Sequence, residues 1–223
     1  NGRRLAVMRG ERDDPDVYIV DLETGIDSRL TFEDGGDQLG CWSPDSKMVD
    51  YTRPTLDGTW VGYRKSADGT GAELEVVRFD NTIIADDVTP DGRWLLLTVW
   101  GGATLWDLKK LDLESLEDGL QDLLAGPDQQ YYCAASPDGQ WLLHHQSAGE
   151  VWNLYVRRLA DAGGRWEIHE STSQFQHAAW SEDGRTIYAR DGRGFLKIDL
   201  SFENGSVQAR PAQLLQLDEG VRS

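Results

Sequence analysis

Few residues in this sequence could act as nucleophiles or as acids and bases. No Gly-x-Ser-x-Gly segment is present, so a nucleophilic serine on a strand-to-helix elbow is not indicated. The four histidines are His144, His145, His169 and His177. His144 and His145 are neighbours in an expected strand, where successive side chains point to opposite faces. They cannot act on one ligand together, and we expect packing or surface roles for all four.

Metal and phosphate chemistry is also weakly indicated. Asp13-Asp14 and Asp86-Asp87 are carboxylate pairs, but neither lies in a loop with the alternating acidic positions of a calcium site. The glycine turns Gly35-Gly36 and Gly69-Thr70-Gly71 lack the Lys-Ser/Thr ending of a nucleotide-binding loop. The catalytic-loop and metal-binding motifs of a protein kinase are missing too. We therefore expect no catalytic residue, no metal site and no cofactor in this chain.

Net charge and the lack of a long apolar run argue against two kinds of partner, nucleic acids and the membrane interior. The formal net charge is −17, and no basic stripe interrupts it, so a nucleic-acid backbone would be repelled. No apolar run approaches the roughly 18 residues of a membrane span. We expect neither nucleic-acid binding nor membrane insertion of this segment.

One short phrase occurs four times, and the other elements are arranged around it. It reads Trp42-Ser43-Pro44-Asp45-Ser46, Val88-Thr89-Pro90-Asp91-Gly92, Ala135-Ser136-Pro137-Asp138-Gly139 and Trp180-Ser181-Glu182-Asp183-Gly184. Its aspartates are 46, 47 and 45 residues apart. Proline presets φ, aspartate hydrogen-bonds back to the chain and glycine accepts a positive φ, so each phrase predicts a tight turn. An apolar run follows each turn, and a turn between strands that recurs at this period is typical of a propeller.

The repeat predicts an all-β fold, a β-propeller of about five four-stranded blades. The expected blades are 1–34, 35–81, 82–127, 128–173 and 174–217, in a single propeller segment. In the third blade, the leucines between 113 and 124 predict either a short helix or a long loop followed by a strand at 120–124. The outer strand of the fifth blade is expected at 207–217.

Tryptophans and cysteines fit this repeat as packing residues. Trp42 and Trp180 precede their turns, which indicates packing between neighbouring blades. Packing is favoured over stacking on a ligand for the remaining tryptophans as well. Cys41 and Cys133 lie two repeats apart, too far to form a disulfide, so we expect buried free thiols.

The whole chain resembles the Pro-Asp-Gly, WD-like propeller repeats of the TolB type. The four turn phrases carry the resemblance, together with Leu30-Thr31-Phe32 before Cys41-Trp42-Ser43. Asn153-Leu154-Tyr155-Val156-Arg157 and Gly163-Gly164-Arg165-Trp166-Glu167-Ile168 are similar to propellers that follow bacterial Ser/Thr kinase or winged-helix regulator domains. Ser46 in place of glycine and Glu182 in place of proline depart from the phrase without preventing a turn. Because the family usually closes a larger ring, the resemblance implies a segment truncated at both ends.

The resemblance implies a non-catalytic binding, sensor or scaffold domain of a larger bacterial protein, which mediates protein or peptide interaction. The alternative is a lid or accessory propeller of a prolyl-oligopeptidase-like hydrolase whose catalytic domain lies outside this chain. A periplasmic or extracytoplasmic location is implied as well. Open propeller edges would further favour self-association.

Acidic residues gather in the loops at one end of the expected blades. Strand directions alternate, so the second-to-third strand loops and the loops between blades share an end. Those loops, at 11–15, 33–38, 54–59, 80–82, 101–103, 126–129, 147–151, 171–175 and 191–193, hold eleven acidic residues and two arginines, a net charge of −9. A solvated acidic rim is one interpretation; a binding face for a cationic peptide or protein is the other. The candidate residues of that face are Glu33, Asp34, Asp37, Asp57, Asp80, Asp128, Glu150 and Asp191.

Overall fold

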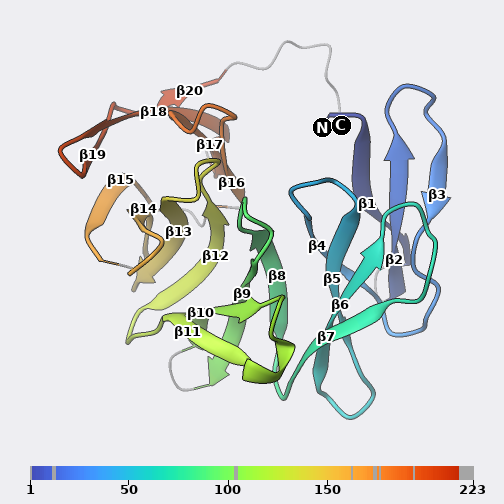
Figure 1. Ribbon diagram of the computed structural model, residues 1–223. Coiled ribbons are helices and arrows are strands. Elements are labelled where there is room, and N and C mark those ends of the chain that lie inside the picture. The colour runs from blue at the N-terminus through green and yellow to red at the C-terminus, as the bar shows by residue number, and fades with distance from the viewer. Residues whose placement is uncertain are drawn as a thin grey trace. The chain divides into compact units, whose positions relative to one another are not determined.

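The computed structural model describes residues 2–11, 14–102, 105–161, 163–172, 175, 177–192 and 194–215. It divides into two compact units, Asn1–Ala125 and Gly126–Ser223. Both units consist of antiparallel sheets in which consecutive strands are neighbours, except that the last described strand does not pair with the one before it (Figure 1). Among the described residues, no helix has the length and apolar character that crossing a membrane requires.

The first unit contains three sheets. Sheet A has three strands, β1 (Arg4–Glu11), β2 (Asp14–Asp21) and β3 (Asp27–Arg29). Sheet B has four strands, β4 (Gln38–Trp42), β5 (Met48–Pro54), β6 (Trp60–Ser66) and β7 (Leu74–Phe79). Sheet C also has four, β8 (Ile83–Val88), β9 (Trp94–Gly102), β10 (Leu105–Asp112) and β11 (Leu120–Leu124), with the 3-10 turn η1 (Leu116–Asp118) between the last two.

The second unit contains two sheets. Sheet D has four strands, β12 (Gln129–Ala135), β13 (Trp141–Ala148), β14 (Val151–Arg158) and β15 (Arg165–Ser171). Sheet E has five, β16 (His177–Trp180), β17 (Thr186–Asp191), β18 (Gly194–Glu203), β19 (Ser206–Ala209) and β20 (Gln213–Leu214). All five sheets lie within the five ranges expected for blades.

Two expectations about single strands can now be decided. Between 113 and 124 the strand alternative is right: η1 is one turn, and β11 pairs with β10. The leucine spacing looked helical because Leu116 and Leu120 both reach the same apolar cluster.

The expected strand at 207–217 is wrong as a single element, because β19 and β20 pair separately with β18. Pro211 lies between them and has no backbone N–H to donate; 216 and 217 are outside the described residues.

The four repeat turns share one hydrogen-bond network. In sheet D, the Ser136 hydroxyl donates to Asp138 Oδ1 (2.5 Å) and accepts from the Trp141 backbone N–H (2.9 Å). Asp138 Oδ1 also accepts from the Gln140 backbone N–H (3.0 Å). The same three bonds are made in the other turns, where the hydroxyl belongs to Ser43, Thr89 or Ser181.

The backbone of these turns has the conformation that the phrase requires. The fifth residue has a positive φ in every copy: Ser46 (59°), Gly92 (77°), Gly139 (69°) and Gly184 (67°). In the first copy a serine has the left-handed conformation. This conformation is higher in free energy for serine than for glycine, but it does not prevent the turn. We call the end of each sheet that carries these turns its turn end, and the opposite end its loop end.

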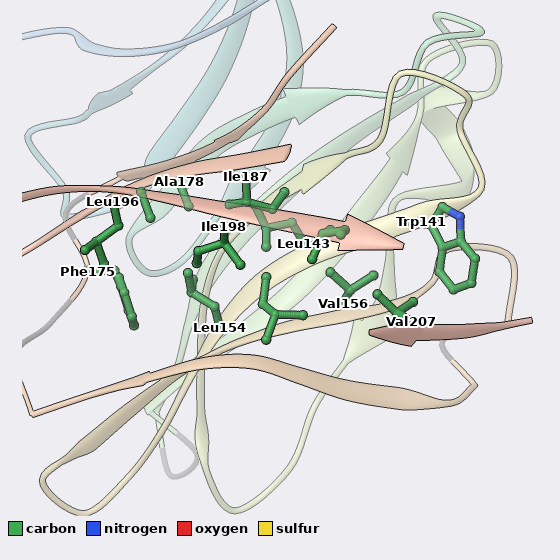
Figure 2. Close-up of a cluster of buried hydrophobic side chains, with 13 residues drawn as sticks. Trp141, Leu143, Leu154, Val156, Phe175, Ala178, Ile187, Leu196, Ile198 and Val207 are labelled. Atoms are coloured by element: carbon green, nitrogen blue, oxygen red, sulfur yellow. The ribbon is translucent and has the colours of Figure 1, made fainter. Parts of the chain in front are cut away.

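Apolar clusters fill the spaces between neighbouring sheets within each unit. Sheets D and E enclose the largest of them, in which Trp141 lies at one end and Phe175 at the other (Figure 2). Trp180 packs against this cluster, and its Nε1–H donates to the Ala134 carbonyl (3.2 Å). Trp42 packs in the equivalent way between sheets A and B. The tryptophans before the turns therefore pack between sheets, as their spacing indicates.

Middle strands are buried on both faces. Leu95, Leu96 and Leu97 of β9 are each at most 1% exposed, which matches the uninterrupted apolar run in the sequence. Cys41 and Cys133 are buried free thiols. Burial is the largest cause that raises the pKa of Cys41, so this thiol stays protonated.

The turn network should contribute measurably to stability. Replacing Ser136, which is 1% exposed, by alanine leaves the Trp141 N–H without its acceptor. Ser136→Ala should lower the free energy of unfolding by about 1–3 kcal/mol in urea denaturation. Ser136→Thr should stay within about 0.5 kcal/mol, because Thr89 makes the same bonds in its own turn.

The control is Gln140→Ala in the same turn, where only the backbone of Gln140 takes part in the network. It should also change stability by less than about 0.5 kcal/mol. If Ser136→Ala is as stable as Gln140→Ala, the hydroxyl does not hold the turn.

Candidate functional site

The loops that carry the expected acidic residues of the first unit meet at the loop end of sheet B. Asp14 Oδ1 accepts hydrogen bonds from the Gly35 N–H (3.1 Å) and the Gly36 N–H (2.9 Å), which joins the start of β2 to the β3–β4 connection. A Cβ on Gly35 would lie 3.1 Å from the Pro54 carbonyl oxygen. The β3–β4 connection therefore rests against the end of β5.

The β5–β6 and β7–β8 connections lie side by side at the same end. Trp60 of β6 pairs with Phe79 of β7, so Asp80 follows directly beside the β5–β6 loop that contains Asp57. The structure thus gathers four of the eight candidate residues at one end of sheet B. We call them the acidic loop end: Glu33, Asp34, Asp57 and Asp80.

These four side chains are exposed. Among the described residues, Glu33, Asp34 and Asp80 have no side-chain hydrogen bond or ion pair. Asp57 accepts hydrogen bonds from the hydroxyl of Thr55 (2.5 Å) and the N–H of Thr59 (3.1 Å). These bonds lower the pKa of Asp57 to about 2, so it stays ionised under all ordinary conditions.

Arg53 lies below the acidic loop end, held between two carboxylates. Its Nε–H donates to Asp37 Oδ1 (2.7 Å), its Nη1–H donates to Glu73 Oε1 (2.9 Å), and its guanidinium carbon lies 4.9 Å from the ring centre of Tyr63. The side chains of Arg53 and Asp37 are 7% and 0% exposed. The Tyr51 hydroxyl donates to Glu73 Oε2 (2.5 Å).

This buried pair fixes the β3–β4 connection. Burial raises the pKa of Asp37, and hydrogen bonds from Thr31 and then Arg53 oppose that rise. Burial lowers the pKa of Arg53, but hydrogen bonds from it to Glu73 and Asp37 outweigh burial and raise the pKa above its usual value. Breaking such a pair would leave an uncompensated buried charge. Glu33 and Asp34 are therefore presented by a loop that is anchored three residues further on.

The other candidate residues lie elsewhere. Asp37 and Asp191 are buried, at 1% and 3% exposed. Asp191 accepts a hydrogen bond from Ser171 Oγ (3.0 Å). Alternation of strand directions predicted the end of the sheet at which these two residues lie, but it did not predict that they are buried. Asp128 is half-buried and accepts from Gln146 Nε2 (2.7 Å), whereas Glu150 is exposed. Asp128, Glu150 and Asp191 belong to the second unit.

His144 and His145 point to opposite faces of sheet D, as strand alternation predicts. The His144 ring stacks on Tyr155 with 5.6 Å between ring centres. Its Nε2 accepts a hydrogen bond from Arg157 Nε–H (3.1 Å), so the proton is on Nδ1, which faces the His145 carbonyl oxygen at 3.3 Å. Burial, followed by the charge of Arg157, lowers the pKa of His144 to about 3.

His145 lies on the other face, between Tyr132 and Phe175, whose ring centres are each 5.3 Å away. It is 0% exposed, and within the described residues neither ring nitrogen has a hydrogen-bond partner. Burial and then the nearby His177 lower the pKa of His145 to about 3. Both buried histidines are neutral at physiological pH and serve as packing groups. Among the described residues, no three His, Cys, Asp or Glu side chains are placed to hold a metal ion.

The Arg53 cluster was not predicted from the sequence. The local signal in the sequence is one cation near the end of an expected strand, immediately before Pro54. Its partners Asp37 and Glu73 are 16 and 20 residues away, and nothing in the repeat spacing links them.

No family model matches the sequence. The chain is similar to the solved structures of TolB from Acinetobacter baumannii (TM-score 0.73, 19% identity, covering 93% of this chain and 51% of that chain) and a putative TolB from Agrobacterium tumefaciens (TM-score 0.70, 14% identity, 94% and 77%). It is also similar to the periplasmic gluconolactonase PpgL of Pseudomonas aeruginosa (TM-score 0.62, 17% identity, 98% and 69%). This chain thus spans about half the length of the Acinetobacter TolB chain.

These similarities, with the five antiparallel sheets, show an all-β, TolB-like propeller fold of about five blades. At these identities they establish the fold alone. The similar proteins include both TolB and a gluconolactonase, so the fold by itself does not distinguish a binding domain from an enzyme.

The buried histidines make stability depend on pH. Their folded pKa of about 3 lies below the 6.5 of an unperturbed histidine, so between these values the unfolded chain binds protons that the folded chain does not. Stability from each histidine is present above pH 6.5 and is lost as the pH falls toward 3. Each should contribute a slope of about 1.4 kcal/mol per pH unit in that window.

His145→Phe should therefore flatten the pH dependence of the free energy of unfolding between pH 6 and 4 by about 1.4 kcal/mol per unit. Urea denaturation across this range measures it, with Tyr188→Phe at an exposed position of sheet E as the control. An unchanged slope in His145→Phe would mean that this histidine is protonated in the folded protein.

Proposed function

We propose that this chain is a non-catalytic interaction domain whose acidic loop end binds a cationic peptide or protein surface. One observation carries the proposal: Glu33, Asp34, Asp57 and Asp80 are exposed at one end of sheet B, and the connection that holds Glu33 and Asp34 is fixed by Asp14 and by the buried Arg53–Asp37 pair. A preorganised surface of one charge loses little conformational freedom on binding.

The arginines near the acidic loop end do not neutralise its four exposed carboxylates. Two arginines beside the anchored loop already have carboxylate partners: Arg53 is engaged by Asp37 and Glu73, and Arg29, which lies over the Phe32 ring, is engaged by Asp16. The field of the exposed carboxylates therefore extends into solvent, where it attracts a basic partner and speeds its encounter. Salt should weaken this attraction, because exposed charges are screened within about 8–10 Å at physiological ionic strength.

For the whole protein we extend the proposal to one propeller domain, attached to a bacterial Ser/Thr kinase or winged-helix regulator as a sensor or scaffold. The sequence phrases of the fourth and fifth blades support that attachment. The competing proposal is a lid over a hydrolase domain. The flanking sequence of the gene discriminates the two: a kinase or winged-helix domain supports the sensor, and a nucleophile elbow supports the lid.

Self-association is a separate proposal. Within the described residues, β1 pairs on one side only, with β2, and Leu5 and Met8 on it are about half exposed. Sedimentation velocity should show association that rises with concentration, and a monodisperse monomer would contradict it.

Charge reversal tests the acidic loop end. Glu33→Lys, Asp34→Lys and Asp80→Lys change three exposed side chains outside the turn bonds and the Arg53 cluster. With a fluorescent octalysine peptide as the probe at low ionic strength, the triple variant should associate about tenfold more slowly or worse in stopped-flow measurements. Added salt should slow the wild type toward the variant.

The matched control reverses three other exposed charges of the same unit at its turn end: Glu23→Lys, Glu117→Lys and Asp118→Lys. It has the same net charge as the test variant, so a general effect of charge would slow both equally. Equal association rates for the two variants would contradict a localised binding face.

A further inference from the structure

A pocket of about 460 Å³ lies at the turn end of the second unit, where the repeat turns of sheets D and E face each other. The two turns touch: a Cβ on Gly184 would lie 3.6 Å from Cδ of Pro137. Trp141 and Phe202 contribute the aromatic part of its lining. This pocket is in a different unit and at a different end from the acidic loop end.

The aromatic part of the pocket is rigid. The rings of Trp141 and Phe202 are 5.0 Å apart between centres, and Trp166 packs edge-on against Trp141 at 5.6 Å. Trp141 lies at the margin of the apolar cluster, beside Val156 and Val207 (Figure 2). The Arg158 guanidinium already lies 5.9 Å from the Trp141 ring centre, which shows that a cation is tolerated against this indole.

Three carboxylates line the same pocket, from Asp138, Glu182 and Asp183. Asp138 and Asp183 use Oδ1 for their turns, and the second oxygen of each accepts no hydrogen bond within the described residues. The hydrogen bond from Ser181 is the largest cause that lowers the pKa of Asp183, so it is ionised at neutral pH. Arg185 is the one cation on the lining, which leaves a net charge of −2.

Comparison of the four repeat turns shows that this pair is unusually acidic. The residue after the fifth position is Lys47 or Arg93 in the first unit but Gln140 in sheet D, so a cation is missing. The third position is proline in three turns but Glu182 in sheet E, so an anion is added. Arg93 also forms an ion pair with Asp112 (2.7 Å). Neither change is needed for the turn, because all four copies make the same bonds.

We propose that this pocket binds the side chain of a basic residue, lysine or arginine, from a peptide segment of a partner. The aliphatic stem of that side chain lies against Trp141 and Phe202, and its cationic group lies among the carboxylates of Asp138, Glu182 and Asp183. Gln140 keeps the entrance free of the competing cation that the other turns carry. The site does not rest on the acidic loop end.

Titration by NMR tests this site on the full chain. The probe is the blocked tripeptide acetyl-Gly-Lys-Gly-amide, with the arginine analogue as a second ligand and the norleucine analogue as an uncharged control. The expected result is saturable shifts of the Gln140, Gly184 and Arg185 amides and of the Trp141 indole with both basic peptides. Norleucine should produce none of comparable size. Equal binding of norleucine, or shifts that neither saturate nor centre on these residues, would overturn the proposal.

Two variants sharpen the test. Gln140→Lys restores the cation of the other repeats and should weaken binding of the lysine peptide by about fivefold or more. Gln213→Lys makes the same charge change on exposed β20, near the loop end of sheet E, and should leave the affinity unchanged. Equal affinities in the two variants would overturn the proposal. The triple reversal of Glu33, Asp34 and Asp80 should leave this titration intact, so failure of either site is recorded separately.

Discussion

The hydroxyl-to-carboxylate hydrogen bond of the repeat turn is the interaction on which the structure depends. One Ser or Thr hydroxyl serves two purposes: it donates to the aspartate and accepts the N–H of the residue five positions on. The aspartate in turn accepts a backbone N–H two residues beyond it. These bonds set where the second strand begins relative to the first, and a shift of one residue would turn every apolar side chain to the wrong face. The clusters between sheets require that register.

Residues at the sheet ends that take no part in the turn bonds can differ from one sheet to the next. At the loop end of sheet B, the chain uses a buried arginine to hold a connection whose exposed residues are acidic. At the turn end of sheets D and E, two side chains that the turn does not need change the charge of a pocket. In the proposed function, the residues that bind a partner are therefore different from the hydroxyl and carboxylate oxygens that hold the turns.

The sequence predicted what is local and periodic. The repeat phrase predicted the turns, the strands beside them and the double burial of Leu95–Leu97, because each depends on residues a few positions apart. It did not predict that Asp37 is buried, since that depends on Arg53, which lies 16 residues away in the next strand of the sheet. The break between β19 and β20 follows from Pro211, which the sequence shows plainly but which periodicity alone ignores.

Hydrogen–deuterium exchange of the full chain, with and without an octalysine peptide at low ionic strength, tests the central claim most directly. If the acidic loop end binds a cationic partner, amides in 33–36, 55–59 and 80–82 should exchange more slowly in the complex, and added salt should abolish the difference. Binding of the peptide with no slowing in these three segments would contradict the account.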